Sequence, residues 1–256
     1  MHVVALHSLR EPKESSAGAL ASALGATVYE ALARLRTPGN GPVVAAVFSD
    51  RERADQLAER LRSAGFSATV VTEEEITAEE DIQEARRFSL KADQLGVTSV
   101  KGDSLSIPFG SVELILRGTA IVQETSTETT KTRKISAERA ILSGGMSMTK
   151  TVKTVREVTT EERQGFFRIY AGEALRMVFF EKGLVYDSLG SEQRHSRAAN
   201  FGYLVAELRR LCPQAVYDER LLTRAGQAGL LGPSLTPEKH ISAAAALLAK
   251  VLRGMA

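Results

Sequence analysis

The sequence predicts an α+β protein, in which an N-terminal β-α-α-β-α-β module precedes an antiparallel β-rich module with C-terminal helices. Over residues 1–72, short apolar runs alternate with segments whose apolar residues recur at helical spacing. Between residues 88 and 190, outside the interval 124–156, separate segments alternate apolar and polar residues, which is typical of half-buried strands. With 256 residues, the chain is long enough for two modest domains.

The first half of the N-terminal module begins with an apolar strand at 3–6. An alanine-rich helix over 16–24 should end at Gly25, because glycine readily adopts the left-handed conformation that terminates helices. Thr27-Val28-Tyr29-Glu30 has the pattern of a capping box and should open a second helix.

The second half of this module repeats the same signals. A strand at 43–48 precedes Ser49-Asp50-Arg51-Glu52, which has the pattern of a second capping box. The helix that follows should end at Gly65, and a last strand is expected at 67–71.

This order of elements, with Gly25-Ala26-Thr27 and Ser63-Ala64-Gly65-Phe66 as helix ends, resembles the C-terminal domain of the bacterial ribosomal stalk protein and the related adaptor of the Clp protease. The Clp adaptor binds substrate N-termini with an acidic, asparagine-containing loop and a histidine. Those residues have no counterpart that can be placed here, so peptide-adaptor activity is not carried over. In the stalk protein the fold is a docking surface, and the resemblance implies a docking role for residues 1–72.

Residues 73–87 are predicted to be an acidic linker between the two modules. Thr77-Ala78-Glu79-Glu80 can cap a short helix. A solvated linker helix and an acidic docking tail both fit this composition. The acidic residues are Glu73, Glu74, Glu75, Glu79, Glu80, Asp81 and Glu84.

The β-rich module is expected to span 88–212. A hairpin should reverse near Gly102-Asp103, because apolar residues recur at period two on both sides of this glycine. Further strands are expected at 112–116, 165–170, 175–180 and 185–189, and an amphipathic helix at 197–212.

A run of antiparallel strands closed by one amphipathic helix is the order of the pleckstrin-homology superfold. Leu105-Ser106-Ile107-Pro108-Phe109, followed by Val112 and Ile115, also resembles a strand of bacterial pleckstrin-homology-like domains. The two-module arrangement as a whole resembles that of uncharacterised bacterial proteins.

Gly102-Asp103-Ser104-Leu105-Ser106 is also the signature string of the GDSL serine esterases. A nucleophilic serine needs a base, an orienting acid and oxyanion donors. In that family a Gly-x-Asn-Asp block and a late Asp-x-x-His supply them. Here the sequence contains no Gly-x-Asn-Asp, and neither His195 nor His240 has an aspartate three residues before it. We therefore expect Ser104 to flank a turn, and a serine hydrolase is the least favoured alternative.

The interval 124–156 is rich in threonine and serine and then becomes basic. If Gly144-Gly145 reverses the chain, two basic clusters would lie on paired strands. A long hairpin or an inserted loop with solvated charges fits this pattern, and so does a surface for a phosphate headgroup, an acidic protein or RNA. RNA is disfavoured because the interval has no aromatic residue for base stacking. The candidate anion-binding residues are Lys131, Arg133, Lys134, Lys150, Lys153 and Arg156.

Residues 213–256 are predicted to be a C-terminal helical extension. A short helix is expected near 218–225, followed by a break rich in glycine and proline. Thr236-Pro237 then has the pattern of a helix start. The apolar stripe of this last helix can pack on its own domain, on a partner or on a second copy.

Composition excludes several classes of function. A net charge of +2 gives no general argument for nucleic-acid binding. The single cysteine, Cys212, cannot form an internal disulfide and fits a reducing compartment; we expect a buried rather than a reactive thiol. We find neither a signal-peptide pattern nor about 18 consecutive apolar residues, and no metal-ligand or phosphate-loop spacing. We expect a cytoplasmic protein without a cofactor.

These patterns favour a non-enzymatic binding or scaffolding adaptor. The alternative is a regulatory module that recognises an anionic ligand or surface through 131–156. A protein partner is expected and a nucleic acid is not, while formation of a homo-oligomer remains open.

Overall fold

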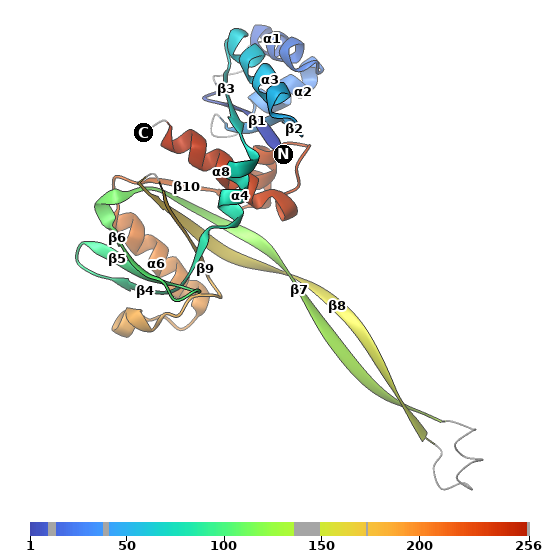
Figure 1. Cartoon of the computed structure of the whole chain (residues 1–256), viewed down its shortest axis with the longest axis vertical. Coiled ribbons are helices and arrows are strands. Elements are labelled where there is room, and N and C mark those ends of the chain that lie inside the picture. Colours follow the sequence, from blue (N-terminus) through green and yellow to red (C-terminus); the bar gives the residue numbers. More distant parts are fainter. Residues whose placement is uncertain (10–13, 38–40, 136–148, 173, 255–256) are drawn as a thin grey trace. The chain divides into compact units, whose positions relative to one another are not determined.

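The structure is a computed structural model that describes the backbone of residues 1–9, 14–37, 41–135, 149–172 and 174–254 (Figure 1). Within these ranges it describes all side chains except those of 14–15 and 122–161. Contacts divide the chain into two units, one formed by Met1–Ala120 with Gln164–Ala256 and the other by Ile121–Arg163.

The first residues fold in the predicted β-α-α-β-α-β order. Their three strands form an antiparallel sheet in the order β2-β1-β3. The elements are β1 (His2–His7), α1 (Glu14–Leu24), α2 (Val28–Leu35), β2 (Val43–Phe48), α3 (Arg51–Ser63) and β3 (Ser67–Val71).

One of the two predicted capping boxes in this module is confirmed. Thr27 accepts the backbone N–H of Glu30 at 3.2 Å, and the Glu30 carboxylate accepts the backbone N–H of Thr27 at 2.8 Å. The box predicted to start at Ser49 is wrong, because Asp50 is the N-cap of α3 and accepts the backbone N–H of Glu52 at 2.9 Å.

The predicted acidic linker contains a helix, α4 (Glu73–Glu80), and the start of a strand. The helix is capped by Thr72 together with Glu75, so the cap predicted at Thr77 is wrong, and Thr77 lies inside the helix. Ile76 and Glu79 are buried and α4 packs on the last helix, so α4 is not a fully solvated linker. The separate stability of residues 1–72 stays a prediction.

A mixed sheet of seven strands follows within the described residues, in the order β10-β7-β8-β9-β4-β5-β6. Together with the first sheet and the helices it confirms the α+β class. The neighbours β4 and β9 are parallel, and so are β7 and β10, so the module is not wholly antiparallel. The strands are β4 (Gln83–Leu90), β5 (Gln94–Ser99), β6 (Ser104–Pro108), β7 (Val112–Ile135), β8 (Thr149–Ala171), β9 (Leu175–Phe180) and β10 (Val216–Leu221).

Two predicted elements differ from the structure. The helix expected near 218–225 is strand β10 followed by α7 (Arg224–Leu231), because residues 216–221 pair with β7. The strand expected at 185–189 is reduced to one bridge between Val185 and Arg87, because the chain turns into the 3-10 helix η3 (Asp187–Glu192). A shorter 3-10 helix, η2 (Phe109–Ser111), links β6 to β7.

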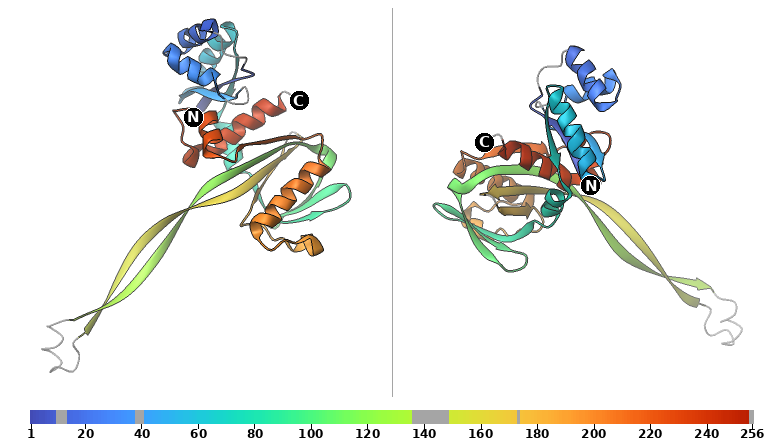
Figure 2. Two further views of the ribbon diagram at one scale, coloured as in Figure 1. Left: turned by 180° about the vertical axis from the view of Figure 1, so that it is seen from behind. Right: turned by 45° about the horizontal axis from the view of Figure 1, so that its top comes forward.

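The predicted closing helix is confirmed as α6 (Arg197–Leu211). Figures 1 and 2 show it alongside β4 and β5, and Phe201 and Leu204 share a core there with Phe88, Leu95 and Ile107.

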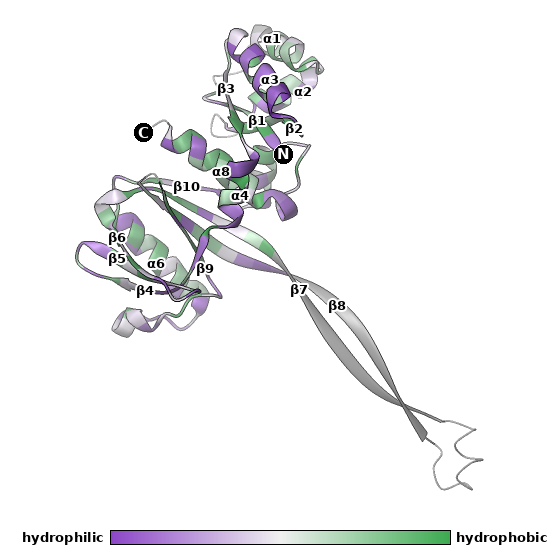
Figure 3. Cartoon of the chain, viewed as in Figure 1, coloured by the Kyte–Doolittle hydropathy of each residue, from purple (hydrophilic) through white to green (hydrophobic). Residues whose placement is uncertain are grey.

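The last helix, α8 (Pro237–Arg253), starts at the predicted Thr236 cap, and Figure 3 shows hydrophobic turns along it interrupted by hydrophilic ones. It shares one core with residues of both sheets, among them Val3 and Val71 from the first and Leu114 from the second. The apolar stripe of this helix could pack on its own domain, on a partner or on a second copy. The structure shows that it packs on its own chain.

Candidate functional site

Ser104 lies beside a hairpin turn, as the sequence predicts. Gly102 has a φ of +96° at this turn, a conformation that favours glycine. One side-chain hydrogen bond is described for Ser104, and it joins its Oγ to Thr98 Oγ1 at 3.4 Å. The adjacent acid, Asp103, instead bonds Ser99: its backbone N–H donates to Ser99 Oγ at 3.2 Å, and its carboxylate accepts from Ser99 Oγ at 3.5 Å. This geometry gives Ser104 no base.

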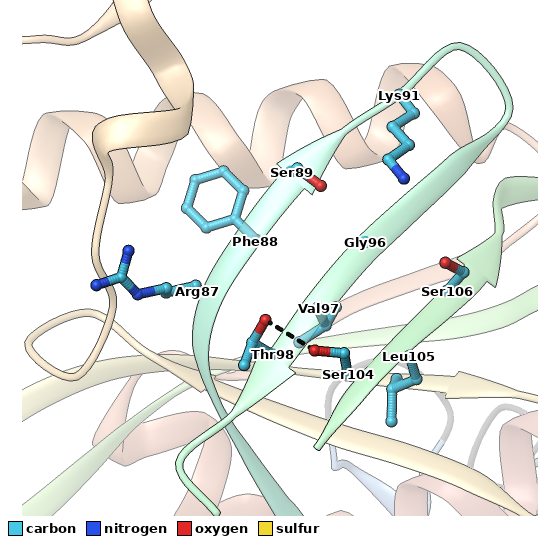
Figure 4. Close-up of a pocket in the computed structure, with 10 residues that line it drawn as sticks. All are labelled: Arg87, Phe88, Ser89, Lys91, Gly96, Val97, Thr98, Ser104, Leu105 and Ser106. Carbon is cyan, nitrogen blue, oxygen red and sulfur yellow. Dashed lines mark hydrogen bonds between the residues drawn. The ribbon is translucent and has the colours of Figure 1, made fainter. Parts of the chain in front are cut away.

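The hydroxyl group of Ser104 belongs to a polar face that crosses β4, β5 and β6 (Figure 4). Two rows of residues in register make this face. The first row is Arg87, Thr98 and Ser104, and the second is Ser89, Gly96 and Ser106. We call these six residues the hydroxyl face. They line a shallow depression of about 400 Å³, and no histidine or carboxylate is among the described residues that line it.

A glycine forms the floor of this depression. A Cβ atom at Gly96 would lie 2.5 Å from Ser89 Oγ and 3.9 Å from Lys91 Cε. Figure 4 shows the Lys91 side chain reaching back from the β4–β5 turn toward Gly96. Neither Lys91 nor Arg87 has an ion pair with another described residue. The depression therefore offers hydroxyl groups and two cations without an ion pair among the described residues, which can bind polar groups.

A second depression lies on the inner side of β6 and has a volume of about 580 Å³. We call it the apolar groove after the apolar side chains that line it, among them Ile82, Leu105, Leu175 and Met177. Ala78 of α4 and the polar residues Asp81, Gln83 and Arg176 line it as well. Leu105 lines the first depression as well. The two depressions therefore meet at β6, one on each face of the strand.

Strand β6 is an edge of the seven-stranded sheet. In an antiparallel ladder, residues alternate between pairs that exchange backbone hydrogen bonds and pairs that do not. The Ser99 N–H bonds Asp103 at 2.8 Å, and the Phe109 N–H bonds Asp93 at 3.0 Å. At the same spacing, Leu105 and Ile107 bond to β5. The backbone groups of Ser104 and Ser106 thus point away from β5, and no described strand pairs with them.

A buried charge cluster attaches α4 to β8 and β9 beside the groove. The Glu79 carboxylate accepts hydrogen bonds from Arg168 and, at 2.7 Å, from the Tyr170 hydroxyl. Arg176 Nη1 lies 3.7 Å from its other oxygen and also lines the groove. Burial, followed by the nearby Glu79 charge, raises the pKa of Tyr170, so this hydroxyl remains a donor.

The sequence does not indicate this cluster, because Glu79 is 89 residues from Arg168. Its three charged side chains occur in segments that are otherwise ordinary for a helix or a strand.

The six predicted anion-binding residues lie in two strands that neighbour each other in the sheet. Their side chains lie outside the described residues, as does the Gly144-Gly145 patch, so the anion surface stays a prediction. Lys131, Arg133 and Lys134 are in β7, and Lys150, Lys153 and Arg156 are in β8.

The part of the chain that the structure describes contains no group of three or more His, Cys, Asp or Glu residues that could hold a metal ion. None of its helices combines the length and apolar character needed to cross a membrane. Cys212 is buried, and burial raises the pKa of its thiol to about 11, which opposes formation of the reactive thiolate.

Comparisons with family models, with curated proteins and with solved structures found no match to this chain.

Proposed function

We propose that this protein is a non-enzymatic cytoplasmic adaptor that binds a partner protein through the free edge of β6. The observation that carries this proposal is the outward-facing backbone of Ser104 and Ser106 between two depressions. An edge strand presents unpaired N–H and C=O groups, and another chain can pair with them. Backbone pairing would supply affinity, and the depressions on either side would supply specificity.

The flanks of the edge support this assignment. Natural proteins protect edge strands with proline, charge or a covering segment. Here Pro108 blocks the C-terminal end of β6, and the charged side chains of Lys101 and Asp103 lie before its N-terminal end. Between them, Ser104 and Ser106 are exposed and carry neither charge nor bulk. The unprotected stretch is therefore short, which limits indiscriminate pairing.

The chemistry of the nucleophilic side chains favours binding over catalysis. Ser104 bonds only a threonine hydroxyl among the described side chains, so no base is placed to take its proton. Burial raises the pKa values of Cys212 and Tyr170, which is the wrong direction for a nucleophile at neutral pH. The single cysteine of the chain supports the cytoplasmic assignment.

The test compares two substitutions at one edge residue. Ser106→Pro removes the outward N–H, whereas Ser106→Ala keeps it and removes only the hydroxyl. Proline should be tolerated, because this N–H is not part of the β5 ladder and Pro108 already occupies the equivalent position two residues on. Tagged full-length chains would be used to capture proteins from native lysate, with circular dichroism to verify the fold.

We expect a set of proteins retained by the wild-type chain and by Ser106→Ala and lost by Ser106→Pro. Retention of the same set by a folded Ser106→Pro chain would refute binding at this edge.

A second candidate function is recognition of an anionic ligand or surface through residues 131–156. The position of both basic clusters on neighbouring strands favours it, because those strands can carry the two clusters side by side.

A further inference from the structure

We propose that the partner supplies an extended segment that adds to β6 as a further strand, with apolar side chains at alternate positions inserted into the apolar groove. The positions between them would carry small hydroxyl side chains against Ser104 and Ser106. This inference rests on the proposed function and specifies the chemistry of the bound segment.

The apolar half of this pattern follows from the groove. A strand places successive side chains on opposite faces, so every second residue of an added strand would face the inner side of β6. That side holds Leu105 and, across the groove, Leu175 and Met177. The groove volume of about 580 Å³ lies within the range of ligand pockets, roughly 300–1,000 Å³.

The groove lies beside the part of β9 that precedes its pairing with β4, because β4 begins only at Gln83. Only Gln83 and Glu84 pair with β9, at Met177 and Val178. Leu175 precedes these paired residues in β9 and is partly exposed. Leu105 of β6, which also lines the groove, is partly exposed as well. Apolar side chains of an added segment would cover both leucines and remove apolar surface from water, which is the main source of binding free energy.

The polar half follows from the hydroxyl face. Residues between the apolar anchors would lie beside Ser104 and Ser106, where threonine or serine can form cross-strand hydrogen bonds. The Arg87 and Lys91 side chains come from β4 and the β4–β5 turn, and β5 separates them from β6 (Figure 4). An added strand beyond β6 would be roughly 14 Å from β4, three strand spacings, so acidic side chains are not required.

A second copy of this chain fits the groove less well. Its own β6 would offer Leu105 as the one partly exposed apolar side chain, because Ile107 is fully buried in the core and the other three residues are serines and a proline. One leucine would leave most of the groove unfilled. The occupant we infer is therefore a segment of a different protein.

The test uses a hexapeptide of alternating valine and threonine, capped at both ends and labelled with a fluorophore, and the full-length chain. Fluorescence anisotropy would measure its binding. Two control peptides separate the contributions: alternating serine and threonine lacks the apolar anchors, and backbone N-methylation of the threonines removes the N–H donors that would face Ser104 and Ser106 in an antiparallel pairing. We expect the first peptide to bind and both controls to bind at least tenfold more weakly, since a tenfold change corresponds to about 1.4 kcal/mol.

Variants of the chain test the position of the bound peptide. Ser106→Pro and Leu175→Ala should each weaken binding by roughly tenfold, through a lost backbone contact and a lost apolar contact. Val100→Ala is the matched control, because Val100 is a 57% exposed apolar residue outside the groove, and this variant should bind as the wild-type chain does.

Hydrogen exchange provides an independent readout. The Ser104 and Ser106 amides should exchange rapidly in the free chain and become protected by the peptide, whereas those of Leu105 and Ile107 should be protected already.

The outcomes distinguish this inference from the proposed function. If Ser106→Pro abolishes partner capture but the valine-threonine peptide does not bind, or binds no better than the serine-threonine peptide, the inference is overturned and edge binding stands. If Ser106→Pro changes neither partner capture nor peptide binding, both are overturned.

Discussion

Replacement of Glu79 by alanine should destabilise the protein far more than an ordinary substitution in a short helix. Glu79 and Arg168 are 2% and 5% exposed, and their ion pair is accompanied by the Tyr170 hydrogen bond. Loss of the carboxylate would leave the Arg168 guanidinium buried without a counter-charge. Breaking a buried pair in this way costs about 3–5 kcal/mol.

The matched control is Glu80→Ala. Glu80 is the next residue of the same helix and is exposed, so its replacement should change the free energy of unfolding by no more than about 0.5 kcal/mol. Urea unfolding followed by circular dichroism would measure both variants. With a denaturant slope of about 3 kcal/mol per molar, the Glu79→Ala midpoint should fall by about 1 M or more.

A double-mutant cycle would assign the cost to the pair. If Glu79→Ala is measured in the wild-type chain and again in an Arg168→Met chain, the second cost should be much smaller, because the stranded charge is gone. Equal costs in both chains, or a Glu79→Ala midpoint equal to that of Glu80→Ala, would refute the reasoning.

Three further predictions concern single features. Thr27→Ala should lower the free energy of unfolding by about 1 kcal/mol in thermal or urea unfolding. Hydrogen bonds from Thr27 lower the pKa of Glu30, so this cap stabilises the fold above the ordinary carboxyl pKa and weakens as the pH falls. A Thr27→Ala effect that is unchanged at low pH would contradict this. A fluorophosphonate probe should leave Ser104 unlabelled, and a covalent adduct at Ser104 by mass spectrometry would reinstate the hydrolase alternative. If the basic interval binds an acidic partner, a triple change to glutamine should reduce partner recovery at low salt, and unchanged recovery would remove the anion-surface hypothesis; the residues changed are Lys131, Arg133 and Lys134.

The parts of the fold that could be predicted are those specified by neighbouring residues. The box between Thr27 and Glu30 needs partners three positions apart, and the Gly102 turn needs one glycine between two alternating segments. The whole N-terminal order of strands and helices follows from such local signals. The cap predicted for α4 was wrong only in its position. Thr72 and Thr77 each have an acidic residue three positions later, and Thr72 also follows a strand.

The parts that could not be predicted depend on residues far apart in the chain. Strand β10 forms because it pairs with β7, where Val216 is in register with Leu114. The local sequence pattern, taken without this partner strand, predicts a helix near 218–225. The sequence also indicates that 104–108 is a strand, but the side on which β5 pairs with it decides which backbone groups remain free. The candidate binding edge is therefore a property of the sheet order.

One residue belongs both to the buried cluster that holds α4 in place and to the proposed binding site. Arg176 approaches Glu79 in the buried cluster and also lines the apolar groove, which is lined as well by Ala78 of α4 and by Asp81, the residue after this helix. Since Glu79 fixes α4 against β8 and β9, the width of the groove depends on this cluster. A Glu79→Ala chain at a temperature where it is still folded should therefore bind the valine-threonine peptide more weakly than a Glu80→Ala chain. Equal affinities would show that the groove keeps its shape without the cluster, and would confine the role of Glu79 to stability.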